Sequence, residues 1–214
     1  SGSLFSGAPN FDQHINSWQT DSVTDLIHML GSARLFNQPL DSWQTGNATT
    51  MSNMFYDALK FNQPLDSWQT GSVAKMEWMF SGATKFNQNI ASWQTGKVKA
   101  MNSMFNGAIA FNQHIVWQTD KVTTMNSMLR DADLFNQNIG SWDTSQVTMM
   151  DDMFNGAYAF NKDIRSWDTS KVMFMRGMFN DARAFNQDIT GWSTASLTSS
   201  GPGAMFTGAI AWLD

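Results

Sequence analysis

The chain is poor in the residue types from which most active sites are built. It has no cysteine, three histidines and a single glutamate, Glu77, among 214 residues. Without cysteine there is neither a disulfide framework nor a thiolate zinc site. No apolar run reaches the roughly 18 residues of a membrane span, and the first residues lack the charged start and apolar segment of a signal peptide. We therefore expect no membrane insertion in this segment.

Charge is also scarce. Charged residues make up 14% of the chain, against roughly 25% in ordinary globular domains. The net charge is -5, and neither half of the chain is basic, which argues against nucleic acid as a partner. Because 42% of the residues are hydrophobic, the chain can still bury a sizeable core, and we expect it to fold.

The remaining polar residues form no catalytic or metal-binding pattern. His14 and His114 occupy the same repeat position four units apart, which at a strand spacing of about 4.8 Å separates them by about 19 Å. The aspartates are scattered, whereas a paired-carboxylate hydrolase needs two converging acids. The sixteen methionines could suggest copper(I), but they follow an apolar stripe and are interpreted as core. We predict no enzymatic activity, no catalytic residue, no cofactor and no metal.

What the chain does contain is a repeat. Tryptophan recurs every 25 residues, with one interval of 24, at Trp18, Trp43, Trp68, Trp93, Trp117, Trp142, Trp167 and Trp192. A fixed period of this length is typical of solenoids, propellers and arrays. We predict a single repeat array over residues 1–214. Both ends fall inside a unit, so we expect this array to be a fragment of a longer surface protein.

The apolar spacing within one unit predicts its local structure. Val98, Met101, Met104, Phe105 and Ala108 follow the three-and-four spacing of one helix face. The next segment, Phe-Asn-Gln-x-Ile-x-x-Trp, is short and rich in strand-forming residues. We therefore predict an α/β repeat solenoid, a leucine-rich-repeat-like right-handed coil of about eight units. Each unit would carry one short strand and one short helix around one continuous core.

Polar residues repeat as regularly as the core. We call equivalent positions in successive units a column. One column is asparagine from Asn37 to Asn186, the next is mostly glutamine, and a third is threonine from Thr20 to Thr194. A stacked amide can bond both the backbone and the next amide, so we interpret these columns as structural.

One unit is shorter than the others. "FNQHIVWQT" has one residue between Ile115 and Trp117, where other units have two. Since the period recovers at once, we predict a tightened turn or altered bulge confined to residues 115–117. Val116 would then be exposed or half-buried.

The repeat resembles a known family. "MFNGAIAFNQHI", "SWDTSQVTMMDDMF" and "SWDTSKVMFMRGMF" are similar to the bacterial surface protein 26-residue repeat, related to BspA-like leucine-rich repeats and mycoplasma lipoprotein repeats. The resemblance implies an extracellular or cell-surface location and a role in adhesion or protein binding, and it brings no catalytic residues. The chain departs from the family by having Gln after Trp in the first five units, where the family tends to have Asp, as at Asp143 and Asp168.

Unusual residues in the outward columns are the candidate ligand contacts. Large apolar residues replace polar ones at Trp78, Met149, Met173 and Phe174, and we expect them to be exposed. The columns beside the repeated Ile vary and supply further candidates, His114, Asp163, Arg165 and Asp188. Variable columns beside constant core columns allow a repeat array to encode a binding surface.

These observations favour a non-enzymatic binding or adhesion module that presents one face to a protein or glycan of a host or neighbouring cell. The alternative is a structural spacer or stalk without its own ligand.

Overall fold

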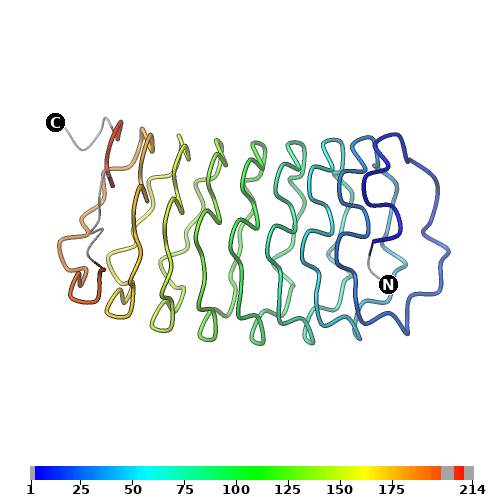
Figure 1. Cartoon of the computed structure of the whole chain (residues 1–214), viewed down its shortest axis with the longest axis horizontal. Helices are drawn as coiled ribbons and strands as arrows, with labels where there is room; N and C mark the ends of the chain where they lie inside the picture. The colour runs from blue at the N-terminus through cyan, green and yellow to red at the C-terminus, as the bar shows by residue number, and fades with distance from the viewer. Residues whose placement is uncertain (1–2, 199–204, 210–214) are drawn as a thin grey trace.

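The computed structural model describes residues 3–198 and 205–209. The chain winds into a stack of coils, and successive repeats lie side by side along the long axis (Figure 1). One coil corresponds to one repeat, because backbone bonds join residues 23 to 26 positions apart, as from the Met51 amide to the Lys75 carbonyl at 3.0 Å. The expected array of stacked units is therefore present.

The local structure of each coil differs from the expectation. The described residues contain no α-helix and no strand longer than an isolated bridge. One parallel bridge joins each pair of neighbouring coils, along the column Asp25, Thr50, Lys75, Ala100, Thr124, Met149 and Phe174. The prediction of an α/β repeat solenoid, leucine-rich-repeat-like with a short strand and a short helix in each unit, is wrong.

Left-handed residues explain why the apolar stripe does not form a helix. Trp78 has φ of 58° and Gly82 has φ of 72°, whereas every residue of a right-handed helix needs a negative φ. Each is the third residue of a four-residue turn, closed by amide-to-carbonyl bonds within 76–79 and 80–83. A positive φ at that position defines a type II turn. Consecutive turns thus direct every third and fourth side chain inward, as a helix would.

The same segment bonds to the next coil through alternate amides. The N–H groups of Met76, Trp78, Phe80 and Gly82 donate to carbonyls of residues 100, 102, 104 and 106 at 2.7 to 3.1 Å. We call this side of the stack, residues 74–82 and their equivalents, the bridge face. Since the spacing repeats in each coil, the backbone fixes the register of every outward side chain.

The interior is one continuous core, as predicted. Buried apolar residues form a single cluster from Ile15 to Met205, and it includes nearly all the methionines. Neighbouring tryptophans stack with ring centroids 6.1 to 6.5 Å apart. Each indole N–H also donates to a carbonyl of the preceding coil, as from Trp93 to Leu65 at 3.0 Å.

The polar columns are structural, as predicted. The Asn37 side-chain oxygen accepts the Asn62 backbone N–H at 2.9 Å and the Gln63 amide at 3.2 Å. The Thr45 hydroxyl donates to the Gln69 carbonyl at 3.1 Å and accepts its N–H at 2.9 Å. Among the described residues, no buried side-chain nitrogen or oxygen lacks a partner. The ladders therefore satisfy the polar groups that the turns leave open.

The short unit loses a turn instead of tightening one. In the preceding coil the Trp93 N–H donates to the Ile90 carbonyl at 3.2 Å, but Trp117 makes no such bond to Ile115 in this described segment. Val116 is 59% exposed and Trp117 stays buried. Local absorption of the deletion and exposure of Val116 are thus confirmed, whereas the tightened turn is not.

Candidate functional site

Trp78 is the most unusual outward residue of the bridge face. Its side chain is 37% exposed, and its backbone is left-handed. Tyr56 of the preceding coil lies against it, with ring centroids 6.3 Å apart and an angle of 66° between the rings. This edge-to-face arrangement is favourable for aromatic pairs. The prediction that Trp78 is exposed is confirmed.

Hydrogen-bonding groups surround this aromatic pair. The Ser52 hydroxyl donates to Glu77 Oε2 at 2.5 Å, and Asn102 Oδ1 accepts from the Thr124 hydroxyl at 3.3 Å. No hydrogen bond joins the side-chain amide of Asn53 to another described residue. The surface around Trp78 therefore offers amide and carboxylate groups beside one exposed and one half-buried aromatic ring.

Three other predicted contact residues come together in two adjacent coils. Met149 and Phe174 pair across a backbone bridge, and both are half-buried, so the prediction that these two side chains are exposed is wrong. Met173 precedes Phe174 and is 39% exposed. We call these three residues the Met–Phe cluster. It lies three coils from Trp78 along the bridge column, so the predicted apolar residues form two patches.

A charged hollow also lies on the bridge face. A cavity of about 280 Å³ is lined by Arg130, Asp151, Asp152 and Arg176, with Asn155. Arg130 forms an ion pair with Asp152 at 3.6 Å, and its side chain is 42% exposed. Exposed pairs of this kind stabilise weakly. No group of three metal-ligating side chains occurs in the part of the chain that the structure describes.

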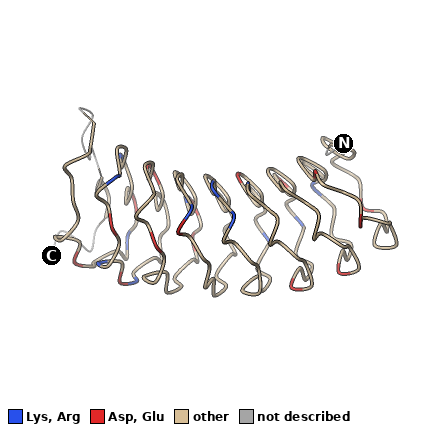
Figure 2. Ribbon diagram, turned by 90° about the horizontal axis from the view of Figure 1, so that it is seen from below, with Lys and Arg blue, Asp and Glu red and all other residues tan. Residues whose placement is uncertain are grey.

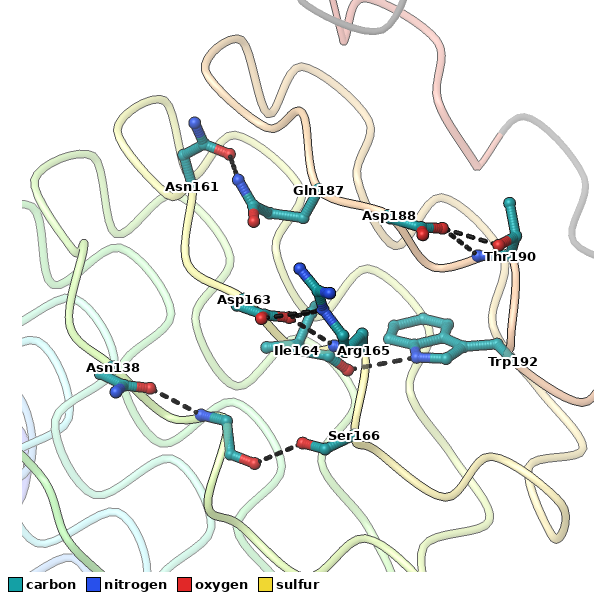
Figure 3. Close-up of polar contacts among 11 residues, drawn as sticks. Asn138, Asn161, Asp163, Ile164, Arg165, Ser166, Gln187, Asp188, Thr190 and Trp192 are labelled. Carbon is teal, nitrogen blue, oxygen red and sulfur yellow. Dashed lines mark hydrogen bonds and ion pairs between the residues drawn. The ribbon is translucent and has the colours of Figure 1, made fainter.

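The second predicted set lies on another side of the coil, beside the asparagine and glutamine columns (Figure 3). Arg165 Nε lies 2.9 Å from Asp163 Oδ2, and the hydrogen bond from the Arg165 backbone N–H lowers the pKa of Asp163. The Thr190 hydroxyl lowers the pKa of Asp188 in the same way. Each acid thus binds the residue two positions later and closes its own turn.

His114 is exposed in the same column as these two acids. It lies two coils before Asp163, with Asn138 between them. The structure therefore brings Asp163, Arg165 and Asp188 into adjacent coils and leaves His114 apart. Lys and Arg positions are likewise spread over several coils (Figure 2).

One exposed apolar group was missed by sequence reasoning. Ile109, Leu134 and Tyr158 are 44%, 55% and 39% exposed in successive coils. The Leu134 N–H donates to the Ile109 carbonyl at 3.3 Å, and Arg183 Cζ lies 4.4 Å from the centre of the Tyr158 ring. The sequence does carry a signal for their exposure, because the two positions before each Phe-Asn pair vary between charged and apolar residues.

The geometry defines a class: a turn-built repeat protein whose distinctive side chains all lie on outer columns. A family model matches residues 2–83, 38–116 and 115–212, and the chain belongs to that family, described as Mycoplasma protein of unknown function, DUF285. No curated protein matches the chain. Within the described residues, no helix is long and apolar enough to cross a membrane.

Proposed function

We propose that this chain is a non-enzymatic binding module, which presents outward columns to a protein or glycan of a host or neighbouring cell. Its place would be extracellular or at the cell surface, as the resemblance to BspA-like surface repeats suggests. The chain would act by contact, through the arrangement of side chains along a rigid stack, and not by chemistry at a cleft.

The Met–Phe cluster is the observation that carries this proposal. Equivalent positions of the other coils hold Asp, Thr, Lys and Ala, so the fold accepts small or polar side chains there. Met173 nevertheless exposes 39% of its surface beside two half-buried apolar neighbours. Large apolar groups gathered on an outer surface are typical of contact sites.

The test compares the chain with a variant in which the Met–Phe cluster is replaced by residues found at equivalent positions of other coils. Met149→Thr, Met173→Thr and Phe174→Thr together install the residue found at the same positions in earlier coils, namely Thr124 and Thr123. Both proteins are applied to a glycan array and to a panel of purified extracellular-matrix proteins. We expect the parent chain to bind at least one probe. If that probe is a protein, the variant should no longer bind it, although the circular dichroism spectrum of the variant should match that of the parent chain.

A spacer is the second candidate. The unbroken backbone ladder and the continuous core favour it, because both make the stack stiff. A spacer has no ligand of its own, so the absence of binding to every glycan and protein probe would support it and refute the binding module.

A further inference from the structure

Trp78 occupies a backbone position that penalises it. Its φ is 58°, and a bulky residue in the left-handed region is a rare and strained outlier. Other coils place smaller or polar residues in this column, namely His28, Asn53, Ser103, Ser127, Asp152 and Gly177. The fold therefore does not require tryptophan here. Strain that folding does not require points to function.

Partial burial does not explain the choice of tryptophan. The side chain is 37% exposed, while the core tryptophans such as Trp93 are 3% exposed. Tyr56 repeats the same anomaly in the preceding coil, since its column otherwise holds Gly31, Ser81, Asn106, Arg130, Asn155, Asn180 and Thr207. Two aromatic residues thus enter two otherwise non-aromatic columns and meet edge to face at 6.3 Å.

The groups around the pair indicate the chemistry of a ligand. Asn53 carries an amide without a hydrogen bond to another described residue, and Asn102 uses its oxygen for Thr124 and keeps its amide donors available. Glu77 accepts from Ser52 through Oε2 alone, so Oε1 remains an acceptor. Donors and acceptors of these kinds suit hydroxyl groups.

A pyranose ring combines both features. One face of the ring carries C–H groups, which are attracted to the negative face of an aromatic ring, and its edge carries hydroxyls. Binding sites for small polar ligands commonly join aromatic walls with a few placed polar groups. We propose that Trp78 and Tyr56, with Asn53, Glu77 and Asn102, bind a neutral pyranose of a glycan, an inference that rests on the binding-module function.

The experiment uses substitutions that the fold already contains. Trp78→Asn installs the residue of the preceding coil, and Tyr56→Asn installs the residue found at 106 and 155. We expect the parent chain to bind at least one neutral glycan on an array, and each variant to lose that binding at least tenfold by saturation-transfer NMR with the same oligosaccharide. Trp78→Asn should keep or raise the melting temperature, because asparagine tolerates the left-handed region.

The Met–Phe variant is the matched control. It should keep its glycan affinity, because its three changes lie three or four coils away. Failure of the parent chain to bind any neutral glycan overturns the inference, as does glycan binding that survives both aromatic substitutions. Binding to a purified protein that Trp78→Asn abolishes would also overturn it, but would leave the binding-module function standing.

Discussion

Because the short unit lacks one residue, one core tryptophan should contribute more to the free energy of unfolding than its equivalents in other coils. In a full unit, the carbonyl before the turn has two donors: Leu65 accepts the Trp68 N–H at 3.2 Å and the Trp93 indole at 3.0 Å. In the short unit, Ile115 accepts only the Trp142 indole, at 3.2 Å. We therefore expect Trp142→Phe to cost more free energy of unfolding than Trp93→Phe.

The magnitude follows from the two acceptors. Both indoles are 3% exposed, and both lie between tryptophans about 6.4 Å away. Trp93 also has the Phe80 ring 6.1 Å away, where the coil of Trp142 has Leu129, so the loss of the hydrogen bond is separated from the loss of packing by the insertion control below. Trp93→Phe loses one of two hydrogen bonds, a net loss of about 1 kcal/mol. Trp142→Phe leaves a buried carbonyl without a partner, which costs about 1–3 kcal/mol. The expected difference between the variants is therefore up to about 2 kcal/mol.

The assay is urea unfolding followed by circular dichroism, with midpoints and slopes compared between the variants. Insertion of Ser between Val116 and Trp117 supplies the control, since it restores the turn and lets the Trp117 N–H reach the Ile115 carbonyl. The insertion should leave the melting temperature within a few degrees or raise it. In that background the cost of Trp142→Phe should fall, because the Ile115 carbonyl then keeps the Trp117 N–H as a donor. Equal losses without the insertion, or a large loss on insertion, would refute the reasoning.

Three further predictions test the packing and the charges. Gly82→Ala should lower the melting temperature more than Gly107→Ala. Both glycines have φ near 70°, but a Cβ at Gly82 would collide with Asp57 Oδ1, whereas a Cβ at Gly107 has no neighbour closer than 3.7 Å. In an Asp57→Ser background the two substitutions should therefore lower the melting temperature equally. The pKa values of Asp163 and Asp188 lie below the ordinary 3.8. The ionised carboxylates therefore stabilise the fold above pH 3.8, and this stabilisation is lost as the pH falls further. Replacing both residues with Asn should flatten the acid limb of a curve of stability against pH. Mild peroxide should oxidise the exposed methionine of the Met–Phe cluster before the buried ones, with mass spectrometry showing its modification before any fall in melting temperature.

Core columns could be predicted from the sequence because residue type alone identifies them. The positions of Val98, Met101, Met104 and Phe105 hold apolar residues in nearly every unit, and all four of these residues are fully buried. The polar ladders could be predicted for the same reason, since an amide repeated at every coil needs a partner at every coil. The short unit was also predicted in part, because later units recover the period without compensation.

Local structure could not be predicted from the apolar pattern. Type II turns in series place side chains inward at the same three-and-four spacing as a helix, so periodicity does not separate the two. The distinguishing signal lies in the residues between: Asn53, Asp57, Gly82 and Gly107 are types that enter the left-handed region, and all four have positive φ. Trp78 is also left-handed, but tryptophan is not a residue type that indicates a positive φ.

In three of the first five units, the glutamine that stands in place of Asp after tryptophan lies against a glycine of the preceding coil. A Cβ on Gly46 or Gly71 would lie 2.6 or 2.5 Å from the side-chain oxygen of Gln69 or Gln94 in the next coil.

The later units close the turn that follows the repeated tryptophan, which we call the corner, in a different way. Asp143 accepts the Ser145 N–H at 2.9 Å and Asp168 accepts the Ser170 N–H at 2.9 Å, so each turn is completed within its own coil. Gln69, Gln94 and Gln118 each lie against a glycine of the preceding coil, but Gln44 follows a coil that has Asp21 at this position, so glycine accompanies most of these glutamines without being required. The two corner types close the same turn in different ways, one with glutamine against glycine across two coils and one with aspartate and serine within one coil.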